Sequence, residues 1–143
     1  MVDDFIARQQ GKTEVKYELP ELEYPARLNC ATALLDRAID RGWGPRTAIV
    51  APGGLRWTYA ELLERANRIA RVLVEDLRLV PGNRVLLRAP NTPLHAACWF
   101  AVMKAGGIAV GTMPLLRAKE LTDIVTKAQV SHALCDARLA AEL

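Results

Sequence analysis

Hydrophobic positions are densest between Arg84 and Leu116, where short apolar runs alternate with breaker residues. The run Arg84–Arg88, rich in Val and Leu, predicts a buried strand. Residues 89–93 form a breaker cluster with two prolines, and Leu94–Lys104 then has helical length without an internal glycine or proline. The pattern therefore predicts a strand, a turn and a helix in succession.

The predicted helix Leu94–Lys104 has its own start and stop signals. Thr92 suits the N-cap, and Gly106-Gly107 stops the helix before a second apolar run at Ile108–Val110. Nearly every helical position is apolar, whereas a surface helix has only one apolar stripe. We therefore expect this helix to be covered on all sides.

The same alternation continues toward the end of the chain. Apolar positions recur at helical spacing in residues 118–127, a third strand is expected at Ser131–Cys135, and Ala137–Leu143 begins another helix. Strands separated by helices of this length predict a parallel βαβαβ arrangement with right-handed crossovers. The expected fold class is α/β, a partly parallel, layered sheet with helices on both faces.

A helix and a β-hairpin are expected to precede this sheet. Asn29 is placed to cap a helix that ends at Gly42, and a Pro-Gly-Gly turn joins two short strands at Thr47–Ala51 and Leu55–Thr58. The sheet with this helix and hairpin accounts for most of the chain.

The helix after the hairpin has the clearest signals. The sequence Thr58-Tyr59-Ala60-Glu61 fits a capping box, and apolar positions then follow one helical face as far as Leu73. Oppositely charged residues four positions apart stabilise the solvent side of a helix. Two such pairs are predicted here: Glu61–Arg65 and Glu64–Arg68.

The chain divides into two parts, and its composition and charge exclude several classes of protein. Residues 1–28 show no sustained period and are expected to form an extended strap or a mobile end, and residues 29–143 contain all of the predicted elements. With 51% hydrophobic and 24% charged residues the chain is typical of one folded domain. A net charge of +3 without a basic stripe argues against nucleic-acid binding, and the longest uncharged stretch is too short for a membrane span. The acidic amino terminus lacks the features of a secretory signal, so a cytoplasmic location is expected.

Few residues suggest catalytic or metal chemistry. Cys30, Cys98 and Cys135 have no CxxC spacing and lie in apolar contexts, so we expect buried free thiols. His95 and His132 have no second ligand at metal spacing and are expected to be structural. The turn after the first parallel strand contains no glycine, which excludes a dinucleotide fingerprint there. These patterns predict no metal site and no catalytic residue.

Three segments carry short motifs in a fixed order. They are RWTYAELLERANRIARVL at Arg56–Leu73, residues 81–116 with GNRV at the strand start and KAG at the helix end, and KELTDIVTKAQVSHALCD at residues 119–136. Together they resemble the amino-terminal region of the adenylate-forming acyl-CoA synthetase superfamily. Within that family, ACWFAVMKAGGIAVGTMPLLRAKEL is most similar to aryl-acid CoA ligases of the benzoate and 2-aminobenzoate type.

The resemblance implies a two-step reaction for the full-length enzyme. ATP and an aryl carboxylic acid would give an acyl-adenylate and pyrophosphate, and the thiol of coenzyme A would then displace AMP. The implied cofactors are ATP, Mg²⁺ and coenzyme A. In the family, the residues that hold ATP and Mg²⁺ lie in later parts of the sequence, so no catalytic residue is carried over and none of these cofactors is expected to bind this chain tightly.

The resemblance also implies that the amino-terminal region forms one wall of the coenzyme A entrance. Asn91, Met113 and Arg138 follow the three predicted parallel strands, at the strand ends where open α/β sheets bind ligands. Arg138 would suit a phosphate of coenzyme A.

Two interpretations of the chain remain open. One is a fragment of an aryl-acid CoA ligase, inactive by itself, and the other is a free-standing α/β binding or assembly module. The short last helix leaves Leu139 and Leu143 without a partner, which favours the fragment. An uncovered apolar face also predicts self-association.

Overall fold

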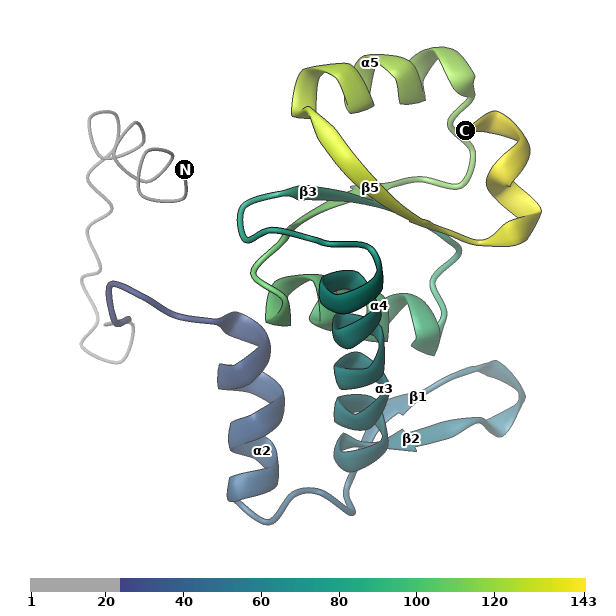
Figure 1. Cartoon of the computed structure of the whole chain (residues 1–143). Coiled ribbons are helices and arrows are strands. Elements are labelled where there is room, and N and C mark those ends of the chain that lie inside the picture. The colour runs from purple at the N-terminus through teal and green to yellow at the C-terminus, as the bar shows by residue number, and fades with distance from the viewer. Residues whose placement is uncertain (1–23) are drawn as a thin grey trace.

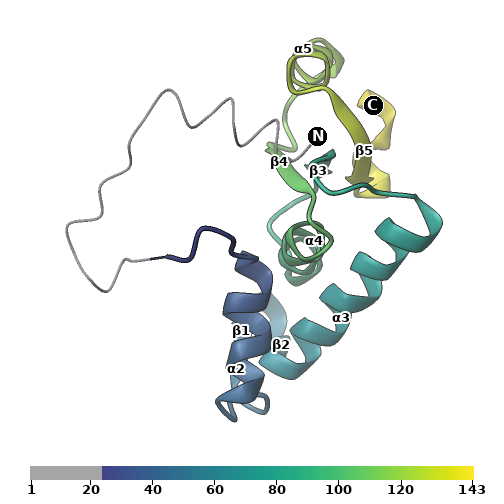
Figure 2. The same ribbon diagram turned by 60° about the vertical axis from the view of Figure 1, so that its left-hand side comes forward.

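The computed structural model describes residues 24–143 (Figure 1). This part contains a first helix, a two-stranded hairpin and a three-stranded sheet with helices on both faces (Figures 1 and 2). The strap predicted for residues 1–28 lies largely outside the described residues. Of that stretch, residues 24–28 are exposed and belong to no helix or strand.

The three-stranded sheet is parallel and has the order β4-β3-β5. Its strands are β3 (Arg84–Arg88), β4 (Ile108–Thr112) and β5 (Val130–Cys135), joined by α4 (Pro93–Lys104) and α5 (Ala118–Ala128). The connection from β3 to β4 and the connection from β4 to β5 run in opposite directions across the sheet. Right-handed crossovers therefore place α4 and α5 on opposite faces (Figures 1 and 2). The predicted α/β class and βαβαβ order are confirmed.

The predicted hairpin and the helix after it are also confirmed. The hairpin consists of β1 (Thr47–Val50) and β2 (Arg56–Thr58), and α3 (Tyr59–Arg71) follows directly. The Thr58 hydroxyl accepts a hydrogen bond from the Glu61 N–H at 3.2 Å, and the Glu61 carboxylate accepts one from the Thr58 N–H at 2.8 Å. Both halves of the capping box are therefore formed.

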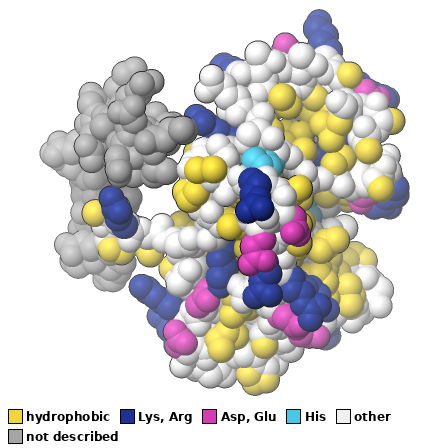
Figure 3. Space-filling view, in the orientation of Figure 1, with side chains coloured by type: hydrophobic (Ala, Val, Ile, Leu, Met, Phe, Trp, Pro, Cys, Tyr) yellow, Lys and Arg dark blue, Asp and Glu magenta, His cyan; other side chains and the backbone are white. Residues whose placement is uncertain are grey.

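One of the two ion pairs predicted on α3 is wrong. Glu64 and Arg68 pair on the solvent side, where acidic and basic side chains alternate along the helix (Figure 3). Arg65 instead donates to the backbone carbonyl of Glu61 at 3.0 Å and stacks 4.2 Å from the ring centre of Trp57. The reason is that the Glu61 carboxylate is already bound to the helix cap.

The first helix begins as predicted and is attached to the rest of the molecule by its cap. It comprises a π-helical turn, η2 (Thr32–Asp36), and α2 (Arg37–Asp40). The Asn29 side-chain oxygen accepts from the Thr32 N–H at 3.2 Å, and its amide nitrogen donates to the Met103 carbonyl at 2.9 Å. Asn29 thus caps one helix and binds the end of α4.

The boundaries of α4 follow local signals. The Thr92 hydroxyl accepts from the His95 N–H at 3.2 Å at the amino end. At the other end Gly106 adopts a φ of 77°, and the Gly107 N–H donates to the Val102 carbonyl at 2.8 Å. This is a Schellman motif, which requires a left-handed residue at the position of Gly106.

The expectation that α4 is covered on all sides is wrong. Ala97, Ala101 and Val102 are buried, but Leu94 is 57% exposed and Trp99 is 39% exposed. Within residues 24–143, α3 and the sheet cover only part of the helix surface. Its remaining apolar side chains therefore contact solvent.

Two clusters of buried side chains form the core, and α4 contributes to both. One joins the sheet to the end of the α3 region: Leu73, Leu79, Val85, Leu87, Ala101 and Val102. The other joins the first helix, the hairpin and α3: Leu35, Trp57, Leu62, Ala66 and Ala97. None of the helices in residues 24–143 has both the length and the apolar character needed to cross a membrane.

The end of the chain is helical, as predicted. Residues Ala137–Glu142 form a helix of the 3₁₀ type, η5. Asp136 caps it by accepting from the Arg138 N–H at 3.0 Å.

Candidate functional site

The carboxyl ends of the parallel strands form the candidate functional edge, because open α/β sheets bind ligands there. Arg88, the last residue of β3, is in register with the last residues of β4 and β5. The segments that follow the three strands contain the predicted residues Asn91, Met113 and Arg138. The geometry of these segments decides whether they form one site.

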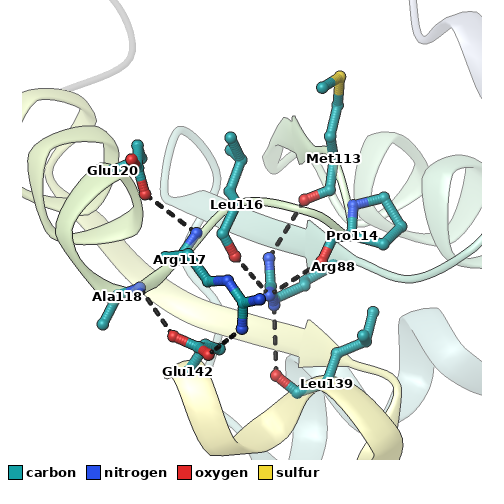
Figure 4. Close-up of polar contacts among 9 residues, drawn as sticks. All are labelled: Arg88, Met113, Pro114, Leu116, Arg117, Ala118, Glu120, Leu139 and Glu142. Atoms are coloured by element: carbon teal, nitrogen blue, oxygen red, sulfur yellow. Dashed lines mark hydrogen bonds and ion pairs between the residues drawn. The ribbon is translucent and has the colours of Figure 1, made fainter.

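Arg88 is the centre of this edge (Figure 4). Its side chain is almost fully buried, with 1% of the residue exposed, and makes four hydrogen bonds to backbone carbonyls. They run from Nε to Leu139 at 3.3 Å, from Nη1 to Met113 at 3.2 Å, and from Nη2 to Pro114 at 3.2 Å and Leu116 at 2.8 Å. One guanidinium therefore binds the loop after β4 and the η5 segment after β5.

The sequence pattern did not reveal Arg88. An arginine at the end of an apolar run resembles the solvated end of any strand. The only sign that Arg88 is buried is its position in the central strand of a sheet with helices on both faces, directly after the buried residues Val85–Leu87. The carbonyl groups that make burial of its charge possible lie 25 to 51 residues further along the chain.

A second link between the same two segments is formed by Glu142. Its carboxylate accepts from the Arg117 side chain at 2.9 Å and from the Ala118 N–H at 3.0 Å, at the start of α5 (Figure 4). The hydrogen bond from Arg117 lowers the pKa of Glu142, with smaller contributions from the Ala118 N–H and the charge of Arg88. Arg117 is 78% exposed, so this link lies at the surface.

Arg138 is exposed but already has a partner. Its guanidinium donates to the two carboxylate oxygens of Asp136 at 2.9 and 2.7 Å. The side-chain and backbone hydrogen bonds from Arg138 lower the pKa of Asp136 to about 2, and the same contact raises the pKa of Arg138. Arg138 lines a cavity of about 220 Å³ together with Arg88 and Glu142. An anion bound there would share Arg138 with Asp136.

Asn91 lies at a different cavity. This cavity, of about 470 Å³, separates the hairpin from the start of α4 and is lined by Asn91, Val50, Trp99 and other mainly apolar residues. Met113 instead accepts a hydrogen bond from Arg88 through its carbonyl, and the residue is 61% exposed. The Met113 carbonyl and Arg138 thus both adjoin Arg88, whereas Asn91 lines a different cavity.

Both histidines contact backbone carbonyls. His95 Nδ1 lies 3.2 Å from the Pro90 carbonyl, and His132 Nε2 lies 2.8 Å from the Leu77 carbonyl. The Nε2 of His95 is buried without a hydrogen-bond partner among the described residues. Residues 24–143 contain no group of three side chains of the metal-binding types close enough to share an ion.

The prediction of three buried thiols is wrong for Cys30. The first helix buries Leu35 and Ala38, whereas Cys30 at its start is exposed. Cys98 and Cys135 are half-buried, and burial raises the pKa of both thiols. All three cysteines are free.

The described residues do not fit a nucleotide phosphate chain with Mg²⁺. Asp136 and Glu142, the carboxylates at the sheet edge, are already bound to arginines. The turn at residues 89–93 contains two prolines, which lack an N–H, and no glycine that would let the backbone approach a phosphate.

Comparison with known proteins shows a family. A family model described as "AMP-binding enzyme" matches residues 35–143. The chain is 43% identical over 94 residues to the salicyl-AMP ligase / salicyl-S-ArCP synthetase of Mycobacterium tuberculosis, covering 63% of this chain and 16% of that protein. It is 31% identical over 87 residues to the 2-hydroxy-7-methoxy-5-methyl-1-naphthoate–CoA ligase of Streptomyces carzinostaticus, covering 61% of this chain and 15% of that protein.

Solved structures show the same fold. The chain resembles the anthranilate CoA ligase AuaEII in complex with anthranoyl-AMP with a TM-score of 0.76 and 22% identity, over 84% of this chain and 22% of that one. A benzoate CoA ligase from Burkholderia xenovorans LB400 gives a TM-score of 0.73 and 25% identity, over 82% and 23% of the two chains. The N-terminal subdomain of Klebsiella oxytoca NpsA gives 0.64 and 21% identity, over 72% and 26%.

The matches cover most of this chain but only a small part of each relative. The chain spans about one sixth of the length of these two curated relatives and about a quarter of each solved chain. The family model, in contrast, matches well over half of this chain, and the parallel sheet lies entirely within the matched residues 35–143. The chain therefore belongs to the AMP-binding enzyme family and has the fold of the N-terminal subdomain of adenylate-forming ligases.

Proposed function

We propose that this chain is the amino-terminal part of an ATP-dependent aryl-acid CoA ligase of the benzoate or 2-aminobenzoate type. Such an enzyme would form an acyl-adenylate and then an acyl-CoA thioester. The observation that carries the proposal is the family match over residues 35–143. Relatives named for salicylate, a naphthoate, anthranilate and benzoate support the aryl class of substrate. Other relatives are named for acetate and for crotonobetaine or carnitine, so the family match alone does not give the substrate class.

In this proposal the chain supplies framework and one wall of the coenzyme A entrance. Met113 and Arg138 would form that wall, with Asn91 further along the same strand ends. ATP and Mg²⁺ would be held by other parts of the full-length enzyme, because Asp136 and Glu142 at the sheet edge are bound to arginines. The chain itself would contribute no reacting group.

A chimera tests the proposal directly. Residues 24–143 would replace the matching region of the benzoate CoA ligase from Burkholderia xenovorans, and pyrophosphate release and thioester formation would be measured with benzoate and 2-aminobenzoate. We expect both activities with ATP. A chimera that folds, as judged by a cooperative thermal transition, but releases no pyrophosphate would contradict the proposal and favour a free-standing α/β binding or assembly module.

The coenzyme A wall has its own test in the same chimera. Arg138→Ala should raise the KM for coenzyme A in the second step and leave pyrophosphate release in the first step unchanged. Arg68→Ala is the matched control, because Arg68 is also an exposed arginine paired with a carboxylate but lies on α3, outside the cavity that Arg138 lines. Equal effects of the two substitutions would argue against a specific role for Arg138.

A further inference from the structure

We propose that Arg88 couples the loop after β4 to η5, so that the two segments open and close as one unit. The coupled segments are residues 113–116 and Ala137–Glu142. They are neighbours in space but are separated in sequence by all of α5 and β5. A specific connection is therefore needed if they are to move together.

The hydrogen bonds of Arg88 are divided between the two segments. Three go to the carbonyls of Met113, Pro114 and Leu116, and one goes to the carbonyl of Leu139 (Figure 4). All of the donors belong to one planar guanidinium, so a single side-chain conformation serves both segments. The Asp136 N–H also donates to the Arg88 carbonyl at 2.8 Å, which places the start of η5 beside β3.

Burial makes this connection cooperative. Arg88 is 1% exposed, and no carboxylate is hydrogen-bonded to it among the described residues. If one segment moved away, part of the guanidinium would lose its acceptors while the other segment still covered it. A buried donor or acceptor that loses its partner is costly, so the opening of one segment favours the opening of the other.

The surface link through Glu142 does not provide the same coupling. Its Arg117 partner is 78% exposed, and exposed ion pairs are screened by water and salt. Arg88 is therefore the positioning residue for both segments. By holding both segments, Arg88 would also place Met113 and Arg138 on one wall of the coenzyme A entrance. This consequence for ligand binding rests on the proposed function.

Hydrogen exchange of the 143-residue chain, without any ligand, tests the coupling. The amides of Leu116 and Leu139 report on the two segments, since they donate within the turns that Arg88 holds, and the amide of Leu143 reports on the following turn of η5. Arg88→Lys keeps the positive charge but loses the planar guanidinium that binds several carbonyls at once. Arg88→Met removes all of the side-chain hydrogen-bond donors. For Arg88→Lys we expect all three amides to exchange about tenfold faster, by a similar factor, while the amides of α3 remain protected.

Two control substitutions make the result decisive. Leu62→Ala destabilises the other core cluster and should accelerate exchange generally. Glu142→Gln weakens only the surface link and should leave the three amides within about twofold of the wild type. The proposal is overturned if Arg88→Lys affects only one segment or neither, if it resembles Leu62→Ala, or if Glu142→Gln has an equal effect. Because no coenzyme A is present, this outcome is independent of the Arg138 test.

Discussion

At the scale of single residues, Arg88 is the least expected feature. Charged side chains are almost never fully buried unless they are paired. Here neutral carbonyls take the place of a carboxylate, and four of them accept from one side chain. Each of these carbonyls, if buried without a donor, would cost about 1–3 kcal/mol. The arginine and the carbonyls therefore depend on each other.

The Asp136–Arg138 pair predicts a titration. Hydrogen bonds from Arg138 lower the pKa of Asp136 from 3.8 to about 2 in the folded chain. Because the folded pKa is depressed, the pair contributes stability above the unfolded value of about 3.8 and loses it as the pH falls toward 2. Carboxyl chemical shifts from NMR should show Asp136 still ionised at about pH 3. In Arg138→Ala the midpoint should move back toward 3.8, though not completely, because the backbone N–H of residue 138 remains. A midpoint unaffected by the substitution would contradict this assignment.

At the scale of elements, helix boundaries follow short-range chemistry. The caps at Thr58 and Thr92 and the left-handed glycine at Gly106 involve residues within five positions of one another. Residues of these types in this order favour such contacts through neighbours in the chain alone. This is why α3 and α4 begin and end close to the predicted positions.

The cap of α3 should contribute measurably to stability. Thr58→Ala removes the hydroxyl that accepts from Glu61, and we expect the free energy of unfolding to fall by about 0.5–2 kcal/mol. Thr58→Ser keeps the hydroxyl and should change stability much less. Denaturant unfolding gives both values. An unchanged midpoint for Thr58→Ala would mean that the hairpin, and not the cap, determines the start of the helix.

Gly106 should be intolerant of a side chain. Its φ of 77° costs an L-residue about 1–2 kcal/mol, and an added Cβ would lie 3.2 Å from the Pro81 Cβ. Gly42 is a matched control, because it has a φ of 75° but a Cβ added there would have no neighbour within 4 Å. We expect Gly106→Ala to lower the thermal midpoint more than Gly42→Ala. Equal shifts would show that backbone conformation alone limits this site.

At the scale of the whole molecule, the chain should have no ligase activity by itself. The described residues lack a free carboxylate group for Mg²⁺ at the sheet edge and a glycine loop for phosphates. Pyrophosphate release from ATP with benzoate should therefore equal the blank without protein. Release above that blank would show that the chain holds a nucleotide site which these residues do not suggest.

Exposed apolar side chains predict self-association. Leu94 and Trp99 are exposed on α4, and Met113 and Leu115 are exposed in the loop after β4. Figure 3 shows hydrophobic side chains on both sides of the charged stripe of α3. Monomeric proteins rarely expose large contiguous apolar patches, so we expect oligomers or binding of a hydrophobic dye at micromolar concentration. Sedimentation decides, and a monomer that binds no dye would favour a self-contained module.

The sequence by itself determined the elements and their order. Alternation of apolar runs, caps and breakers depends on neighbours in the chain, and it was sufficient to predict the hairpin, α3, α4 and the parallel βαβαβ sheet. The motifs in the same segments predicted the family that the comparison shows. Interactions between neighbouring residues and the order of the motifs were thus sufficient to predict the fold class and the family.

Only the tertiary structure decided which side chains are buried and which residues form a site. Arg88 acquires its acceptors from distant segments, and Asn91 and Arg138 line different cavities although both follow parallel strands. The exposure of Trp99 depends on which elements pack beside α4. These features are set by contacts between segments far apart in the chain, and a pattern of neighbouring residues contains no information about such contacts.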